Sequence, residues 1–322
     1  MGMEKEIKMD KLFAVIMTGI TLIGSNHPQN IIAYGSLIGL IFIIFCFLIT
    51  RLPGRVERTD LGCRKSPYDK RDLLVSSFLF DLTELPISLN YRDKMPPVRN
   101  QGKEGSCTGH AADYLKQYQE KIDYNRLIVL SPRFIYEEAK KISGGSEGST
   151  MKAVSEALIK KGICEENFWP YIAGNIGNPK DGTYDNALKY KESPIYTRIT
   201  NEKELKGSLV KFGPIIAGVL VYKNWYRQKN GRIPDSTFWE GLYGALGGHA
   251  ICICGYDDDM GEYMFINSWG EEWGDKGYGY ITYKHMKKIL MDAFALIDID
   301  DPKPYKKTVA DLSFWQRRTR WV

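Results

Sequence analysis

The hydrophobic pattern is dominated by an apolar run over residues 31–50, which contains no charged side chain. A helix rises about 1.5 Å per residue, so a run of this length covers a bilayer's hydrocarbon core of about 30 Å. A buried helix of a globular domain normally keeps a polar face, and this run has none. The pattern therefore predicts a transmembrane helix over residues 31–50.

A second apolar run, over residues 12–24, is shorter than a membrane span usually requires. It follows Lys5, Lys8 and Lys11, and three interpretations fit it: the core of a signal peptide, an interfacial or re-entrant segment, or the first arm of a helical hairpin. A hairpin that turns at residues 25–30 explains both runs more economically than a signal peptide does. We expect residues 1–50 to form a membrane region with one or two spans in a lipid bilayer.

Basic side chains follow the predicted span closely: Arg51, Arg55, Arg58, Arg64, Lys65, Lys70 and Arg71. Lys and Arg near a span resist translocation, whereas acidic residues count for little. The six cysteines show no spacing typical of a disulfide framework, which also favours a reducing compartment. We expect the chain beyond the span to lie in the cytosol.

The remaining chain divides by composition into three parts. Residues 51–84 are polar and indicate a juxtamembrane linker or a short pro-like arm, residues 85–300 suffice for one domain or two lobes, and residues 301–322 form a basic tail with aromatic side chains. The 322 residues are 43% hydrophobic and 26% charged, which excludes fibrous and wholly disordered classes. The net charge of +5 comes without a clustered basic stripe, so no nucleic-acid partner is expected.

A glycine-rich turn over residues 101–106 runs directly into a helical pattern. Apolar positions recur there at helical spacing: Cys107, Ala111, Leu115, Tyr118 and Ile122. This pattern places Cys107 at a helix N-terminus, where the dipole and the free backbone N–H groups favour a thiolate. We therefore expect a lowered thiol pKa and a nucleophilic Cys107.

Two strand-like runs, over residues 250–256 and 262–269, are joined by a turn signal and predict a β-hairpin. If the hairpin is centred on Asp258, His249 lies opposite Asn267 with both side chains on one face. A slip of one residue would separate them. In the predicted register a neutral Asn holds the imidazole by a hydrogen bond and leaves the other ring nitrogen for the thiol.

The motifs around these residues resemble those of papain-like cysteine peptidases. Gln101 precedes Cys107 by six residues, as a Gln precedes the nucleophile in that family. His249 lies in a Gly-Gly-His-Ala motif within the expected interval of about 130–150 residues after the cysteine. Asn267 begins the sequence Asn-Ser-Trp-Gly. The resemblance covers about residues 85–300.

Two departures make the chain more similar to bacterial, xylellain-type relatives than to lysosomal cathepsins. Glu104 stands where papain and the cathepsins carry a disulfide-forming cysteine, and Thr108 stands where an aromatic residue usually follows the nucleophile. The missing disulfide cysteine fits a cytosolic domain. Residues 51–84 are too few for the family's long prodomain, so inhibition by a large propeptide is not expected.

The resemblance implies an α+β, papain-like fold of two lobes, a helical one led by Cys107 and a sheet-rich one carrying His249 and Asn267. It implies a nucleophilic Cys107, a general base His249 and an orienting Asn267, with the oxyanion held by Gln101. The following residues are candidates for the substrate cleft: Gly144, Gly145, Gly148, Gly248 and Trp269.

Other candidate groups are interpreted as structural. His110 flanks Cys107 on the same helix and cannot easily reach back over the thiol. His285 lies in a polar stretch and is expected at the surface. Cys164, Cys252 and Cys254 lack the spacing of zinc ligands and are expected to be buried free thiols, so neither a metal nor another cofactor is expected.

These observations predict a membrane-anchored cysteine endopeptidase that hydrolyses protein or peptide substrates through a thioester intermediate. Two alternatives use the same fold: an acyl transferase or peptide ligase with the same triad, and a binding protein without catalysis. The substrate, the cleavage specificity and the oligomeric state are not fixed by the sequence.

Overall fold

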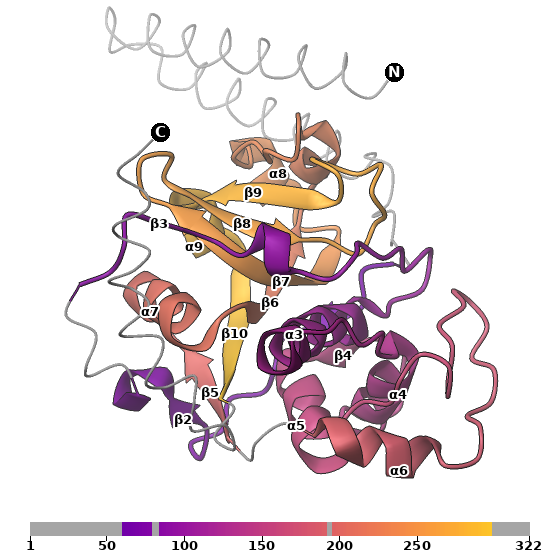
Figure 1. The fold of residues 1–322 in the computed structure, drawn as a ribbon. Coiled ribbons are helices and arrows are strands. Elements are labelled where there is room, and N and C mark those ends of the chain that lie inside the picture. The colour runs from indigo at the N-terminus through magenta and orange to yellow at the C-terminus, as the bar shows by residue number, and fades with distance from the viewer. Residues whose placement is uncertain (1–59, 79–83, 192–194, 298–322) are drawn as a thin grey trace, which may run out of the picture. The chain divides into compact units, whose positions relative to one another are not determined.

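The computed structural model describes residues 60–78, 84–191 and 195–297 (Figure 1). The predicted membrane region over residues 1–50, the start of the predicted linker and the basic tail over residues 301–322 lie outside these ranges. In the described ranges, no helix is both long and apolar enough to cross a membrane.

One half of the structure is helical (Figure 1). Its helices are α3 (Cys107–Tyr124), α4 (Pro132–Ile142), α5 (Met151–Lys161) and α6 (Thr183–Ala187). Helix α4 begins where the Ser131 hydroxyl accepts from the Phe134 N–H, and α5 begins where the Thr150 hydroxyl accepts from the Ala153 N–H. These N-caps satisfy backbone donors that the first turn leaves free, which is why each helix starts there.

The other half is an eight-stranded sheet with the order β2-β5-β10-β6-β7-β8-β9, to which β3 adds by pairing with β7. All of these pairs are antiparallel except β2 with β5. The strands are β2 (Leu73–Leu74), β3 (Ser88–Asn90), β5 (Ile195–Ile199), β6 (Ile215–Val221), β7 (Gly247–Asp257), β8 (Glu262–Ile266), β9 (Tyr278–Thr282) and β10 (Leu290–Ile297). A separate two-stranded ladder joins β1 (Cys63–Arg64) to β4 (Ser149–Thr150).

Further helices and 3-10 turns complete the described ranges. They are α7 (Glu202–Phe212), α8 (Phe238–Tyr243), α9 (Tyr283–Ile289) and the 3-10 turns Val75–Phe78, Arg92–Lys94, Leu188–Tyr190 and Lys223–Arg227. Helix α7 starts at Asn201, whose side chain accepts from the Glu204 N–H, and it ends at Gly213, whose φ of 87° suits glycine. Strand β6 begins two residues after Gly213.

Two hydrophobic clusters lie on opposite faces of β7. Cys252 and Cys254 pack with Leu115 of α3 in the cluster between helices and sheet. Ile251 and Ile253 join the second cluster, which lies within the sheet half. Side chains of a strand alternate between its faces, so residues of β7 contribute in turn to both clusters. Because both faces are buried, the sequence of β7 is apolar almost throughout. This buried strand gives His249, near its start, a fixed position.

An ion pair anchors the loop before Cys107. Both guanidinium nitrogens of the buried Arg133 on α4 contact the Glu104 carboxylate, one pair of atoms being 2.7 Å apart. Burial alone would raise the pKa of Glu104, but hydrogen bonds from Arg133 and the Gly174 N–H outweigh it and hold that pKa below its usual value. Glu104, at the position where papain has a disulfide cysteine, thus ties the loop to α4 by charge instead.

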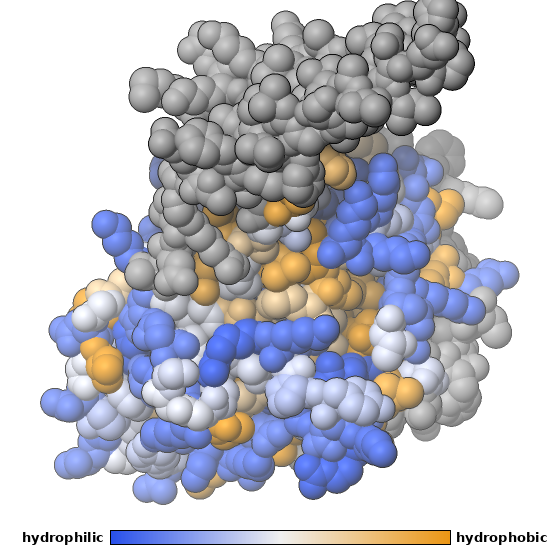
Figure 2. All heavy atoms as spheres, turned by 180° about the vertical axis from the view of Figure 1, so that it is seen from behind, coloured by the Kyte–Doolittle hydropathy of each residue, from blue (hydrophilic) through white to orange (hydrophobic). Residues whose placement is uncertain are grey.

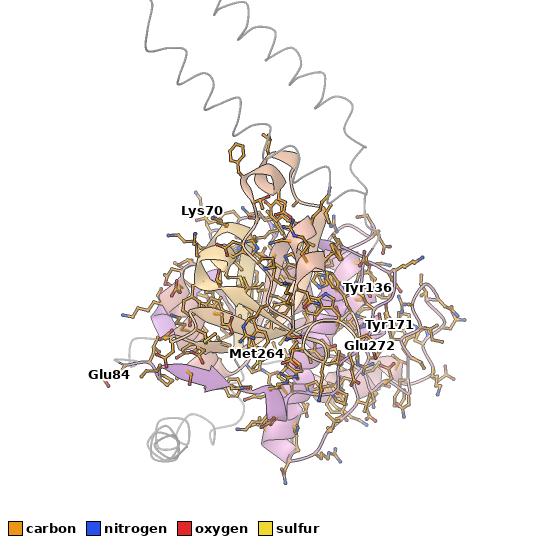
Figure 3. The ribbon with its side chains drawn as sticks, turned by 90° about the horizontal axis from the view of Figure 1, so that it is seen from above. Lys70, Glu84, Tyr136, Tyr171, Met264 and Glu272 are labelled. Atoms are coloured by element: carbon orange, nitrogen blue, oxygen red, sulfur yellow. The ribbon has the colours of Figure 1, made fainter. Side chains whose placement is uncertain are left out.

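The tyrosines of the helical half support the same loop. Both Tyr136 and Tyr171 are labelled in Figure 3. The Tyr171 hydroxyl donates to the Gln101 carbonyl at 2.8 Å and lies 2.6 Å from the Ser106 hydroxyl. The Tyr136 hydroxyl accepts from the Gly148 N–H at 3.0 Å. Hydrogen bonds of these two tyrosines therefore hold the loop before Cys107 and the loop that contains Gly148.

The surface is mixed in character. On the face seen in Figure 2, hydrophilic side chains cover most of the periphery and hydrophobic ones gather near the centre.

His285, expected at the surface, is instead fully buried, and its Nε2 lies 2.9 Å from the Asn224 amide nitrogen. The polar sequence around His285 gave no sign of this burial; His285 lies in the first turn of α9, where its N–H donates to the capping Thr282 hydroxyl.

Candidate active site

Cys107 is the first residue of α3 and is completely buried. Backbone hydrogen bonds from Ala250, Gly62 and Thr108 reach its sulfur. Ala250 is the next residue after His249 on β7, so the thiol lies beside the imidazole residue at the junction of the helical and sheet halves. The sequence prediction that Cys107 begins a helix agrees with this placement.

His249 and Asn267 are joined directly, since His249 Nε2 lies 2.7 Å from Asn267 Oδ1. The same Asn267 oxygen accepts from the Ser268 N–H at 2.9 Å, which fixes the orientation of the amide. The Trp269 ring lies over the imidazole with 4.6 Å between ring centroids, and Trp225 meets its edge at 6.0 Å. This aromatic wall keeps water from the bond between His249 and Asn267.

The predicted hairpin register is wrong, although the predicted contact forms. Near the turn Asp257 faces Glu262, and beyond an irregularity between Ile253 and Gly255 the partner of Cys252 is Ile266. Because the turn is centred later than Asp258 and a bulge intervenes, His249 and Asn267 are not directly opposed. The shift preserves the shared face, and side chains offset along a strand pair still reach each other.

Gln101 lies beside Cys107 with its side chain fully engaged. Its amide nitrogen donates to the carbonyl oxygens of Asp60 and Glu104, each at 2.8 Å. Its amide oxygen accepts from the Ser268 hydroxyl at 2.5 Å. Ser268 was not among the predicted site residues. Its hydroxyl bonds Gln101 and its N–H bonds Asn267, so it links Gln101 to the residue that orients His249.

Residues 60–66, called the arm below, pass directly over Cys107. On the helical side, the Gly62 carbonyl accepts from the Ser149 N–H at 2.9 Å, and β1 pairs in parallel with β4. A Cβ atom at Gly148 would lie only 2.3 Å from the Gly62 oxygen. Of the three predicted cleft glycines in this loop, Gly148 thus lies against the arm, whereas Gly144 and Gly145 are exposed, with open space where a Cβ atom would lie.

On the sheet side, the arm lies equally close to the loop before His249. Gly62 forms a parallel bridge with Gly248, where a Cβ atom would lie 2.0 Å from the Cys63 carbonyl oxygen. The Cys63 side chain is buried in the cluster that also holds Cys107 and Ala250. The cleft between the two halves is therefore filled by the chain itself.

The last residue of the arm and the chain just after it are bonded to both halves. The Ser66 N–H donates to Asp292 Oδ2 at 2.7 Å, and the Ser66 hydroxyl accepts from the Lys152 N–H at 3.1 Å. Further on, Asp72 forms ion pairs with Lys152 and Arg198 at 2.6 and 2.7 Å. The segment predicted as a linker or a short pro-like arm thus packs on the folded domain over residues 60–78.

The expected lowering of the Cys107 pKa does not hold in this arrangement. Burial raises the pKa of Cys107 to about 11, against the backbone hydrogen bonds that favour the thiolate. The helix N-terminus is present as predicted, but the arm excludes water from the sulfur, and the loss of solvation outweighs the dipole. The thiol is therefore protonated at neutral pH while the arm is seated.

His110 takes no part in this group. It is buried, its Nδ1 lies 3.1 Å from the Ser106 carbonyl, and its ring meets the edge of Tyr171 at 4.5 Å. Burial lowers the pKa of His110 to about 3, so the imidazole is neutral. Its role is to pack the start of α3, as the sequence interpretation holds.

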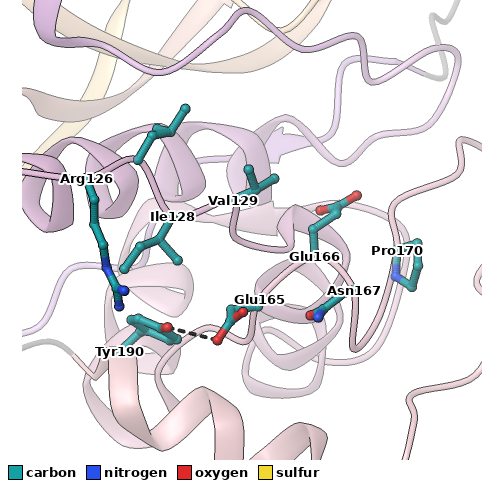
Figure 4. Close-up of a pocket in the computed structure, with 9 residues that line it drawn as sticks. Arg126, Ile128, Val129, Glu165, Glu166, Asn167, Pro170 and Tyr190 are labelled. Atoms are coloured by element: carbon teal, nitrogen blue, oxygen red, sulfur yellow. Dashed lines mark hydrogen bonds between the residues drawn. The ribbon is translucent and has the colours of Figure 1, made fainter.

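A pocket of about 640 Å³ lies elsewhere, on the helical half (Figure 4). Its wall includes Arg126, Glu166 and Tyr190, and the Tyr190 hydroxyl donates to Glu165 at 2.9 Å. None of the candidate site residues lines it.

Cys164, Cys252 and Cys254 are buried free thiols, and the described ranges contain no group of three His, Cys, Asp or Glu arranged for a metal.

Comparisons with known proteins agree with this geometry. Residues 85–297 match the family described as papain family cysteine protease. A peptidase C1-like protein of Acanthamoeba polyphaga mimivirus is 25% identical over 76% of this chain and 88% of its own length. Cathepsin K of Gallus gallus is 29% identical over 63% of this chain, a match that spans 60% of the cathepsin. The crystal structure of xylellain, a cysteine protease from Xylella fastidiosa, superposes with a TM-score of 0.66 at 26% identity, over 77% of this chain and 99% of xylellain.

Proposed function

This chain belongs to the papain family of cysteine proteases, and we propose that Cys107, His249 and Asn267 carry out its peptidase reaction. The observation that carries the proposal is the 2.7 Å contact between His249 Nε2 and Asn267 Oδ1 beside the Cys107 sulfur. An amide oxygen only accepts hydrogen bonds, so it selects the tautomer with a proton on Nε2. The other nitrogen, Nδ1, is then the base that takes the thiol proton.

The reaction follows from these positions. The Cys107 thiol transfers its proton to His249, and the thiolate attacks the carbonyl carbon of the substrate peptide bond. The oxyanion accepts hydrogen bonds from the Gln101 amide and from the backbone N–H of Cys107, which as a first-turn donor has no acceptor within the helix. His249 protonates the leaving amine, and water activated by His249 then hydrolyses the thioester.

In the described conformation the arm occupies the cleft, so the enzyme is inactive until the arm leaves. The Gln101 amide, proposed to hold the oxyanion, is bonded to the Asp60 carbonyl, and the Gly62 N–H rather than a carbonyl carbon meets the thiol. A substrate cannot enter the glycine-walled passage while Gly62 and Cys63 fill it. We propose that this short arm inhibits the enzyme, and that its departure exposes the site.

Digestion of a peptide library by the full chain, with products identified by mass spectrometry, tests the function. We expect pairs of fragments whose summed masses exceed the mass of the parent peptide by one water, because hydrolysis completes the thioester pathway. New peptides joined end to end would identify a ligase using the same residues. A library left intact by a folded protein whose arm has been displaced would contradict a peptidase.

We further propose that residues 1–50 anchor the peptidase to a membrane with its catalytic domain in the cytosol. The uncharged run over residues 31–50 and the basic residues after it support this topology. Protease added to intact cells should leave residues 85–300 uncut until the membrane is permeabilised, while an external marker protein is digested at once. Prompt digestion of the domain in sealed cells would contradict the cytosolic orientation.

A further inference from the structure

We propose that helices α8 and α9 dock on the anionic surface of the membrane to which residues 1–50 anchor the chain. The inference rests on the proposed membrane anchorage and adds the face of the catalytic domain that meets the lipid. This docking face consists of an apolar strip on α8 and three lysines on α9: Phe238, Gly241, Leu242, Lys284, Lys287 and Lys288.

Helix α8, at the margin of the sheet half in Figure 1, turns its polar side inward. Glu240 is 5% exposed, and its carboxylate accepts from the Thr237 N–H at 2.8 Å and lies 2.9 Å from a guanidinium nitrogen of Arg227. Phe238 and Leu242, one helical turn apart, are 72% and 49% exposed. A surface helix of a globular domain normally has the opposite orientation. The N-terminal cap and the ion pair therefore hold an apolar strip toward the solvent.

A hollow of about 570 Å³ joins this strip to α9. Phe238 and Leu242 line the hollow from α8, and Lys288 lines it from α9. The three lysines of the docking face are exposed, and their spacing places them on one side of α9. Apolar and basic side chains thus meet on one continuous surface.

The docking face is positively charged. Of the carboxylates beside it, Glu240 is held by Arg227, and Asp235 lies 3.5 Å from Lys284. The cytoplasmic surface of a membrane carries anionic lipids, and each lysine near such a surface strengthens binding about fivefold. Lysines around exposed aromatic and aliphatic side chains are typical of helices that bind anionic bilayers.

The connection to the predicted span ends beside the docking face. Residues 51–59 join that span to the arm, and these nine residues reach no more than about 30 Å when fully extended. Within the arm, Leu61 contacts Gly247, where a Cβ atom would lie 2.8 Å from the Leu61 side chain. Gly247 pairs with Val221, and the next residue, Tyr222, lines the hollow beside α8. The anchored chain therefore meets the folded domain next to the docking face.

This short connection explains why a small docking face suffices. Two apolar side chains and a few lysines would bind lipid only weakly on a free protein. A short tether, however, supplies the membrane surface at an effective concentration on the order of millimolar, so a weak contact is formed most of the time. A protein partner without a tether would need a larger buried surface. The tether and the charge therefore favour the bilayer as the occupant.

The test places a fluorescent NBD group on α8 of the full chain in lipid vesicles. Gly241→Cys suits the label because nothing lies within 4 Å of a Cβ atom there, and the described cysteines of the wild type are buried. Met260→Cys is the matched control. Met260 is 57% exposed and lies beyond the other end of β7, a strand that spans about 30 Å from Gly247.

In vesicles of phosphatidylcholine and phosphatidylserine, we expect the label on α8 to shift its emission to shorter wavelength and to be quenched by a nitroxide-bearing lipid. The control label should show neither change. Changing all three lysines of the docking face to glutamine should lower the ratio of docked to undocked molecules about 10²-fold, and changing them to arginine should retain it. Phe238→Ser should lower the ratio about tenfold, because the lipid then buries less apolar surface.

Flotation of carbonate-washed vesicles first shows whether the chain is inserted. A chain that does not float with them would overturn the proposed anchorage and this inference together. An inserted chain whose α8 label is quenched no more than the control, or is quenched equally in phosphatidylcholine alone, would overturn this inference only. Shifted emission without quenching by the nitroxide lipid would show that protein covers α8, which also contradicts docking on lipid.

Discussion

Substituting Gly62 by leucine should raise kcat/KM of the full chain for a peptide substrate by about 10³-fold, because the arm can no longer be seated. A Cβ atom at Gly62 would lie 1.9 Å from the Gly105 carbonyl oxygen, a distance that backbone atoms cannot accept. The apparent affinity of a site rises in proportion to the fraction of molecules in which it is open. A 10³-fold gain corresponds to an arm that vacates the cleft in about one wild-type molecule in 10³.

The same substitution should change the reactivity of Cys107 toward iodoacetamide. With the arm seated, burial raises the pKa of Cys107 to about 11, so at pH 7 only about one thiol in 10⁴ is ionised. Labelling of the wild type at pH 7 should therefore be slow and limited by the small fraction of molecules whose arm has left the cleft. In Gly62→Leu the thiol is open, so labelling at pH 7 should be faster by a factor similar to the gain in turnover.

Lys65→Leu is the matched control, because it adds the same side chain to an exposed position of the arm. Its turnover and alkylation should resemble those of the wild type. Gly62→Ala provides a smaller change in the same direction, since the clash already involves the Cβ atom, and far-UV circular dichroism reports whether each variant is folded. Folded Gly62 variants with wild-type turnover and wild-type alkylation would show that the arm does not control the site.

The helices and the chemistry near Cys107 could be predicted from sequence because both depend on local patterns. The helix that begins at Cys107 followed from the spacing of its apolar residues and from the glycine-rich turn before it. The hairpin register could not be predicted in the same way. A bulge near Cys254 and a longer turn shifted it, and neither has a distinct signature in the sequence.

The position of the arm in the cleft could not be predicted from the sequence, for a different physical reason. Its contacts with Gly105, Gly148 and Gly248 join segments far apart in the chain and use backbone atoms, which no side-chain pattern records. For the same reason the raised pKa of Cys107 could not be foreseen, since a helix N-terminus alone predicts the opposite direction.

In the Gly62→Leu chain, Cys107→Ala and His249→Ala should each reduce kcat by a factor on the order of 10⁶. Members of such a triad act as a unit, so the double variant should be little slower than either single one. Asn267→Ala should lose less, between about 10-fold and 10⁴-fold, because the neutral amide orients the imidazole without balancing a charge. His110→Phe should keep most of the activity, since His110 packs away from the thiol.

Trapping of the acyl-enzyme tests most directly whether Cys107 is the nucleophile. The Gly62→Leu chain is mixed with an activated ester of a peptide, quenched in acid within milliseconds and mapped by mass spectrometry. The account predicts an added acyl mass on the fragment containing Cys107 and on no other fragment, with no adduct in Cys107→Ala. Turnover accompanied by an acyl group on a different residue, or undiminished turnover in Cys107→Ala, would contradict it.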